Sequence, residues 1–251
     1  MEYEIKRFEV MSVLKIGIIM GVLPALFYGL IFVSVNEIAA GAVFVVFFLF
    51  GWPIAAIVYN FAANKFGGIK TGIERYETEY NIKRFDVMSM LKIGIILGIP
   101  FSIFFYSILM PLLYSKNTGD FGSVGIIIAG VFAGVINGIV LAITSFVYNL
   151  GAEGEGIKIE TKEHEIKRFK AMSVFKTVSS IVIIILVLAT IVIGLIVGVR
   201  SGLDGMIFII IGIVGGAIYG VFIGIFYAIG AIIYNFAAGK IGGIKVEIKE
   251  Q

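Results

Sequence analysis

The chain has 251 residues, of which 59% are hydrophobic and 15% are charged, and its mean hydropathy is +1.05. A soluble globular domain has about 45–50% apolar residues, so this composition excludes an ordinary soluble protein and indicates an integral membrane protein. The sequence has no cysteine, which excludes disulfides and thiolate metal sites. A net charge of +3 is too small to indicate a nucleic-acid partner, and we expect none.

One sequence unit occurs three times. It opens with Ile-Lys-Arg-Phe and closes with a Tyr-Asn pair that Gly-Ile-Lys follows. The openings lie at 5–8, 82–85 and 166–169, and the Tyr-Asn pairs at 59–60, 148–149 and 234–235. Successive openings are roughly 80 residues apart, which is longer than a solenoid repeat. The sequence therefore predicts three tandem repeats, at 1–76, 77–161 and 162–251.

Each repeat contains two long apolar runs that a short polar loop separates. About 20 apolar residues in a helix cross the hydrocarbon core of a bilayer, and each run reaches this length. The predicted spans are 14–35, 38–62, 90–114, 123–149, 174–199 and 206–237. The predicted fold class is thus an α-helical polytopic membrane protein with six transmembrane helices in three two-helix repeats.

The positive charges indicate how the chain is oriented. Of the 20 Lys and Arg residues, only Lys116 and Arg200 lie in the loops between paired spans. The positive-inside rule then predicts that both termini lie in the cytoplasm and that the protein sits in the cytoplasmic (inner) cell membrane. Lys15, Lys92 and Lys176 lie one turn inside the first span of each repeat, where they can reach lipid headgroups.

The junctions between repeats alternate apolar and polar residues, which is the period of half-buried strands. This pattern predicts one β-hairpin across 68–85 and another across 157–169. The strands at 3–8 and 244–248 lack a local partner, and an unpaired edge is a liability in any sheet. We expect a pseudo-threefold axis to bring these two strands together, which gives a small six-stranded cytoplasmic sheet or ring.

Glycines recur at every fourth position in the second spans of repeats two and three. Such a row forms a bare groove that lets helix backbones approach closely within lipid. The glycines predicted to pack in this way are Gly130, Gly134, Gly138, Gly212, Gly216, Gly220 and Gly224.

The Tyr-Asn pairs lie near the cytoplasmic exit of each second span. We expect Asn60, Asn149 and Asn235 to hydrogen-bond the backbone or a serine hydroxyl near the start of the neighbouring first span. A ligand site made of the three asparagines around the axis is the alternative. The tyrosines fit the aromatic belt at the membrane interface.

A few polar residues are candidates for a pore or a binding site. Asn137 lies at bilayer depth, so we expect a packing hydrogen bond to a neighbouring helix, with a transport site as the alternative. Each outward loop carries one acid, Glu37, Asp120 or Asp204, which either caps a helix in water or belongs to a ring that attracts cations. The lone histidine, His164, lies in a predicted turn, where one imidazole does not make a metal site.

The sequence offers no catalytic constellation. It has no Ser-His-Asp set, no cluster of intramembrane carboxylates, no phosphate-binding Gly-rich loop and no spaced metal ligands. We therefore expect a protein that is not an enzyme and that holds no cofactor.

The order Ile-Lys-Arg-Phe-Asp-Val-Met-Ser, two spans, Tyr-Asn and a closing Gly-Gly-Ile resembles a family of small prokaryotic two-span membrane proteins of unknown function. The resemblance covers nearly the whole chain three times, and it is best through 82–92 and 148–160. Repeat three departs from it at Lys170-Ala171, and repeat two has Glu155-Gly156 in place of the double glycine. The resemblance implies the fold and the membrane placement, and it implies no activity.

These features favour a non-enzymatic scaffold or accessory subunit that packs against another membrane protein or further copies of itself. The glycine grooves and the scarcity of intramembrane polar groups support this hypothesis. The alternative is a channel or transporter with a path along the pseudo-threefold axis. A third is a protein that binds anionic lipids through Lys15, Lys92 and Lys176, and membrane lipids are expected partners in every case.

Overall fold

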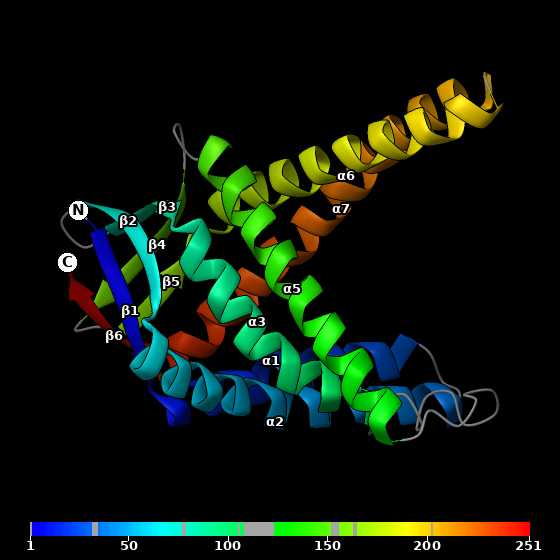
Figure 1. Ribbon diagram of the computed structural model, residues 1–251. Coiled ribbons are helices and arrows are strands. Elements are labelled where there is room, and N and C mark those ends of the chain that lie inside the picture. The colour runs from blue at the N-terminus through cyan, green and yellow to red at the C-terminus, as the bar shows by residue number, and fades with distance from the viewer. Residues whose placement is uncertain are drawn as a thin grey trace.

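The computed structural model describes residues 2–31, 35–76, 79–104, 106–107, 123–151, 156–162, 165–201 and 203–251. Within these ranges the chain is mostly helical, and long apolar helices stand on a small antiparallel β-barrel (Figure 1). The N-terminal and C-terminal strands lie next to each other in the barrel, on the side away from the helix tips.

The helices of the described chain form three consecutive pairs. They are α1 (Val10–Ile31), α2 (Val35–Phe66), α3 (Val87–Phe104), α5 (Ser123–Gly151), α6 (Ala171–Ser201) and α7 (Leu203–Ile241). Four described stretches are long and apolar enough to cross a membrane, namely Val87–Phe104, Gly125–Leu150, Ala171–Val199 and Gly205–Ile241. These four overlap the spans predicted at 90–114, 123–149, 174–199 and 206–237, and the first of them is described only as far as Phe104. Helix α1 contains most of the span predicted at 14–35 and α2 contains the span predicted at 38–62, and their crossing of a membrane stays a prediction.

The barrel consists, within the described residues, of six strands that pair in chain order. They are β1 (Glu2–Phe8), β2 (Ile69–Tyr76), β3 (Glu79–Phe85), β4 (Ile157–Lys162), β5 (Glu165–Phe169) and β6 (Ile244–Glu250). The two predicted hairpins are confirmed as β2–β3 and β4–β5. The terminal strands also pair, with Ile5 opposite Ile248 and Phe8 opposite Val246, and this pairing closes the barrel.

The interior of the barrel is filled by side chains. Thr71, Ile159 and Val246 hold the same place on the strand that follows each second helix, and they are 2%, 6% and 5% exposed. The lysines that precede Thr71 and Val246 are exposed, as strand alternation requires when these two residues point inward. Even about eight strands leave an interior only wide enough for side chains, so a six-stranded barrel is closed by its own residues.

The helices pack mainly as three hairpins, α1 with α2, α3 with α5, and α6 with α7. Neighbouring hairpins also touch through α2 and α3, α5 and α6, and α7 and α1. The hairpin of α6 and α7 extends away from the other four helices in Figure 1. Long helical faces are therefore left uncovered by the described chain.

The best-buried apolar side chains lie where the helices meet the barrel. One cluster joins Ile16 of α1 to the end of α7, at Tyr234, Ala237 and Ala238. A matching cluster joins the end of α2 to Ile93 of α3 and contains Tyr59, Ala62 and Ala63. Both clusters place small alanines at a helix–helix contact, so this junction fixes the hairpins relative to the barrel.

Candidate functional site

Each Tyr-Asn tyrosine joins two strands at the helix–barrel junction. The Tyr59 hydroxyl donates to the carbonyl oxygen of Ile5 at 2.6 Å and accepts from the N–H of Ile69 at 3.0 Å. The same pair of bonds links Tyr148 to Ile82 and Ile157, and Tyr234 to Ile166 and Ile244. Each hydroxyl therefore holds the strand that precedes a pair of helices beside the strand that follows the same pair.

The prediction that these tyrosines form an interfacial aromatic belt is wrong. Tyr59, Tyr148 and Tyr234 are only 3%, 3% and 5% exposed. The reason is the opening phenylalanine, whose ring packs edge-on against the tyrosine ring, as in Phe8–Tyr59 with centroids 4.9 Å apart. The same contact occurs in Phe85–Tyr148 and Phe169–Tyr234.

The asparagine of each pair holds one backbone residue by both ends of its amide. Asn60 Oδ1 accepts from the N–H of Phe8 at 2.8 Å, and Asn60 Nδ2 donates to the carbonyl oxygen of Phe8 at 2.8 Å. Asn149 holds Phe85 and Asn235 holds Phe169 in the same way. These contacts are with the backbone just before the first helix, so the amides act in positioning rather than pointing into an open site.

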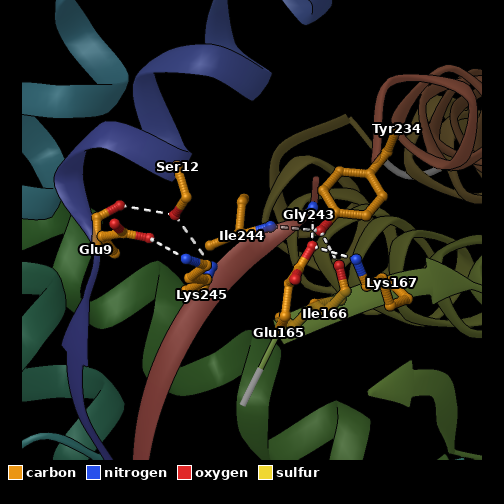
Figure 2. A network of polar contacts seen from close by, with 9 residues as sticks. All are labelled: Glu9, Ser12, Glu165, Ile166, Lys167, Tyr234, Gly243, Ile244 and Lys245. Carbon is orange, nitrogen blue, oxygen red and sulfur yellow. Dashed lines mark hydrogen bonds and ion pairs between the residues drawn. The ribbon is translucent and has the colours of Figure 1, made fainter. Parts of the chain in front are cut away.

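The serine at the start of α1, α3 and α6 accepts a hydrogen bond from a strand that follows a different helical hairpin. Ser89 Oγ accepts from the N–H of Lys70 at 3.1 Å, and Ser173 Oγ accepts from the N–H of Lys158 at 3.1 Å. Ser12 Oγ accepts from the N–H of Lys245 at 3.0 Å, as Figure 2 shows. The bonds thus run around the junction and return from the last strand to the first helix.

Two carboxylates, the buried Glu4 and the partly buried Glu165, bind the backbone just after the end of a second helix. Glu4 Oε1 accepts from the N–H of Gly68 at 2.5 Å and forms an ion pair with Lys6 at 2.8 Å. Burial alone raises the pKa of Glu4, but its hydrogen bonds with Lys6, Gly68 and Gln251 outweigh burial and leave the pKa below its ordinary value.

Glu165 repeats this arrangement with the N–H of Gly243 and with Lys167, whose Nζ lies 2.7 Å from its carboxylate (Figure 2). Its pKa is likewise raised by burial and lowered further by Lys167 and Gly243, so that it lies below the ordinary value. Asn81 takes this position on β3, and its buried Oδ1 has no partner among the described residues. Sequence reasoning missed the two glutamates, because they look like ordinary polar residues of an alternating strand.

The glycine rows pack α5 against α3 and α7 against α6. A Cβ at Gly134 would lie 2.5 Å from the backbone nitrogen of Ile99, and one at Gly220 would lie 2.4 Å from Ile183 Cγ1. The other facing pairs are Gly130 with Ile103, Gly138 with Ile95, Gly212 with Thr190, Gly216 with Leu186, and Gly224 with Ser179. The grooves are therefore occupied inside the chain.

The other polar candidates are not brought together. Asn137 is exposed on α5 and makes no hydrogen bond to the described residues, so the expected packing bond is not found there. Glu37 and Asp204 belong to α2 and α7, but their side chains lie outside the described part of the chain. Asp120 and His164 lie outside the described residues altogether.

Cationic and apolar side chains are exposed together around the junction. Lys15, Lys92 and Lys176 are exposed near the start of α1, α3 and α6. Each follows by four residues an exposed methionine, namely Met11, Met88 or Met172. Phe61, Leu150 and Phe236 follow the Tyr-Asn pairs and are 62%, 63% and 62% exposed. Sequence reasoning missed these exposed methionine, phenylalanine and leucine positions, although their recurrence after the Ile-Lys-Arg-Phe and Tyr-Asn motifs could have revealed them.

Among the described residues, no group of three or more His, Asp or Glu side chains is placed to hold a metal ion. The resemblance to two-span membrane proteins remains a prediction. Comparison with protein-family models, with curated proteins and with solved structures finds no match to this chain.

Proposed function

We propose that this chain is a non-enzymatic integral membrane scaffold or accessory subunit that packs against another membrane protein. The uncovered faces of the α6–α7 hairpin carry the proposal. Leu188, Val192 and Ile196 form one stripe on α6 at a spacing of four residues, and they are 54%, 57% and 61% exposed. Ile210, Val214 and Ile218 form a similar stripe on α7. Extended apolar faces of this kind fit partner helices or lipid.

The proposal includes six transmembrane helices in three repeats, 1–76, 77–161 and 162–251, around a pseudo-threefold axis. The recurring tyrosine, asparagine and serine contacts support this arrangement, as does the pairing of β6 with β1. We place the barrel and both termini in the cytoplasm, because nearly all Lys and Arg residues lie on that side of the predicted spans.

The filled barrel favours a scaffold over a channel. Thr71, Ile159 and Val246 occupy the interior, and a path along the axis would have to pass between them. The glycine grooves are filled by the neighbouring helix of the same hairpin, so they are not a surface for a partner protein. The outward stripes on α6 and α7 are left as the surface for a partner.

Bulky apolar substitutions on α6 test this proposal. Val192→Trp and Ile196→Trp keep the helix compatible with lipid but change the shape of its exposed face. We expect both to abolish copurification of a membrane protein that the wild type retains in a fixed ratio after gentle extraction. Val140→Trp is the matched control on α5, where Val140 is 50% exposed. Equal recovery of the partner with all three variants would contradict the proposed surface.

A further inference from the structure

A polar cleft lies outside the α6–α7 stripes, where the end of α7 meets strands β4 and β5. Its volume is about 600 Å³, and its lining consists of Glu160, Lys167, Arg168, Asn235, Phe236, Ala238 and Gly239. The amide of Asn235 hydrogen-bonds both backbone groups of Phe169, so this part of the cleft lining is fixed relative to β5.

Arg168 provides an available positive charge in this cleft. Its side chain is exposed and forms no ion pair or hydrogen bond with the described residues, whereas Lys167 is paired with Glu165 at 2.7 Å. Glu160 lies opposite Arg168 in the β4–β5 register, but the two charged groups form no ion pair. A guanidinium with free donors suits a phosphate group, which it binds through two parallel hydrogen bonds.

An apolar stripe on α7 begins at the edge of the cleft. Phe236, Ile232, Ile229 and Ile225 are 62%, 58%, 49% and 43% exposed. Their spacing places them on one face of the helix, and the stripe runs from the barrel toward the membrane-spanning part of α7. A ligand that follows this surface has a phosphate at one end and an alkyl chain at the other.

We propose that this cleft binds the headgroup of one anionic phospholipid, with an acyl chain along the Phe236–Ile225 face of α7. The site is particular to the third repeat. No described atom lies within 4 Å of the position that a Cβ would take at Gly239. The residue that stands five positions after the tyrosine of the first unit is Asn64, an exposed residue of α2, whose side chain occupies the space that Gly239 leaves open on α7.

Lipid titration of the full-length protein in a non-ionic detergent tests the proposal. We expect dioleoylphosphatidylglycerol to bind with one tight site per chain, and dioleoylphosphatidylcholine to bind more weakly by about tenfold or more. Arg168→Gln and Gly239→Asn should each weaken phosphatidylglycerol binding by about tenfold, the first by removing the cation and the second by filling the cleft. Gly239 is exposed and has an ordinary helical φ, so Gly239→Asn should leave the unfolding temperature nearly unchanged.

Arg84→Gln is the matched control, since Arg84 is the exposed arginine at the equivalent position of β3. It should leave the tight site intact. Equal weakening by Arg84→Gln and Arg168→Gln would show that general surface charge binds the lipid, and it would overturn the proposed site. Binding of soluble glycerol phosphate as tightly as the lipid, with the same dependence on Arg168, would show a free-phosphate site and would also overturn it.

Discussion

The hydroxyl oxygen of Ser12 accepts a hydrogen bond from the backbone N–H of Lys245 at 3.0 Å, although 233 positions separate the two residues. Ser12 lies in the first turn of α1 and Lys245 lies in β6, so the bond joins opposite ends of the chain (Figure 2). The N–H of Glu9 also donates to the carbonyl oxygen of Lys245 at 3.0 Å. The barrel is therefore closed by the helix start as well as by the β1–β6 ladder.

Ser12→Ala should destabilise the closed barrel. Ser12 is 7% exposed, so the substitution removes the acceptor of the Lys245 N–H at a site that water reaches poorly. We expect the free energy of unfolding to fall by about 1–3 kcal/mol, measured by denaturant titration in detergent micelles. Ser180→Ala, at an exposed position of α6, is the control and should change little. Equal effects of the two substitutions would show that the bond does not help to close the barrel.

Asn60→Asp should weaken the junction even though it preserves the shape of the side chain. A carboxylate can accept from the Phe8 N–H but cannot donate to the Phe8 carbonyl oxygen, so two acceptors would face each other. We expect a loss of about 1–3 kcal/mol in the free energy of unfolding. Asn64→Asp, one turn further at an exposed site, controls for the added charge. A loss as large at Asn64 would assign the effect to charge alone.

Gly134→Ala and Gly215→Ala should have opposite effects on stability. At Gly134 the new Cβ would lie 2.5 Å from the nitrogen and 2.6 Å from the Cα of Ile99, which are backbone atoms, so α3 and α5 must separate. The expected loss is about 1–3 kcal/mol. At Gly215 no described atom lies within 4 Å, and alanine should stabilise α7 by up to about 1 kcal/mol. Unfolding in mixed micelles measures both, and a loss at Gly215 would contradict the packing.

The stability of the barrel should decrease in acid through Glu4 and Glu165. Both pKa values lie below their ordinary value of 4.5, so the folded state favours the charged carboxylates. Their contribution is therefore complete above the ordinary pKa and is lost as the pH falls through the lowered pKa.

The double variant Glu4→Gln, Glu165→Gln tests this origin of the acid sensitivity. It should be less stable than the wild type at neutral pH, and it should lose less stability between about pH 5 and pH 3. Melting temperatures measured across this range report both quantities. Parallel pH profiles for the variant and the wild type would assign the acid sensitivity to other groups.

Asn81→Glu should stabilise the protein by completing the arrangement that β1 and β5 already have. Position 81 matches Glu4 and Glu165, and Lys83 follows it at the same interval as Lys6 and Lys167. The buried Oδ1 of Asn81 has no described partner, whereas a longer carboxylate could reach the Gly156 N–H and Lys83. We expect a gain of about 0.5–1.5 kcal/mol at neutral pH. Asn81→Gln supplies the length without the charge and should gain less, so a gain from glutamine as large as the gain from glutamate would refute the ionic explanation.

The helices and strands could be predicted from the sequence because their periods are local. The apolar runs and the alternating junctions gave the right elements, and the two strands without local partners indicated a closed layer. In the structure β1 pairs with β2, β6 pairs with β5, and β1 and β6 pair with each other, which closes the barrel. The sequence predicted that the strands at 3–8 and 244–248 pair, but it did not predict the register that places Ile5 opposite Ile248.

The partners of individual side chains could not be predicted. The spacing of Gly134 and Gly220 shows a bare helical face, but it does not show that Ile99 and Ile183 of the preceding helix fill it. Tyr59 looked like an interfacial tyrosine because its burial depends on Phe8, which lies 51 positions earlier and meets it only in the folded chain. Long-range contacts of this kind leave no local pattern.

Native mass spectrometry of the protein extracted gently from its own membrane, without overexpression, tests the proposed scaffold role most directly. The proposal predicts a complex in which the 27.2 kDa chain is bound to a second membrane protein in a fixed ratio. Val192→Trp should release that protein, and Val140→Trp should retain it. A mass that corresponds only to the 27.2 kDa chain or its integer multiples, apart from bound lipid, would contradict the proposal.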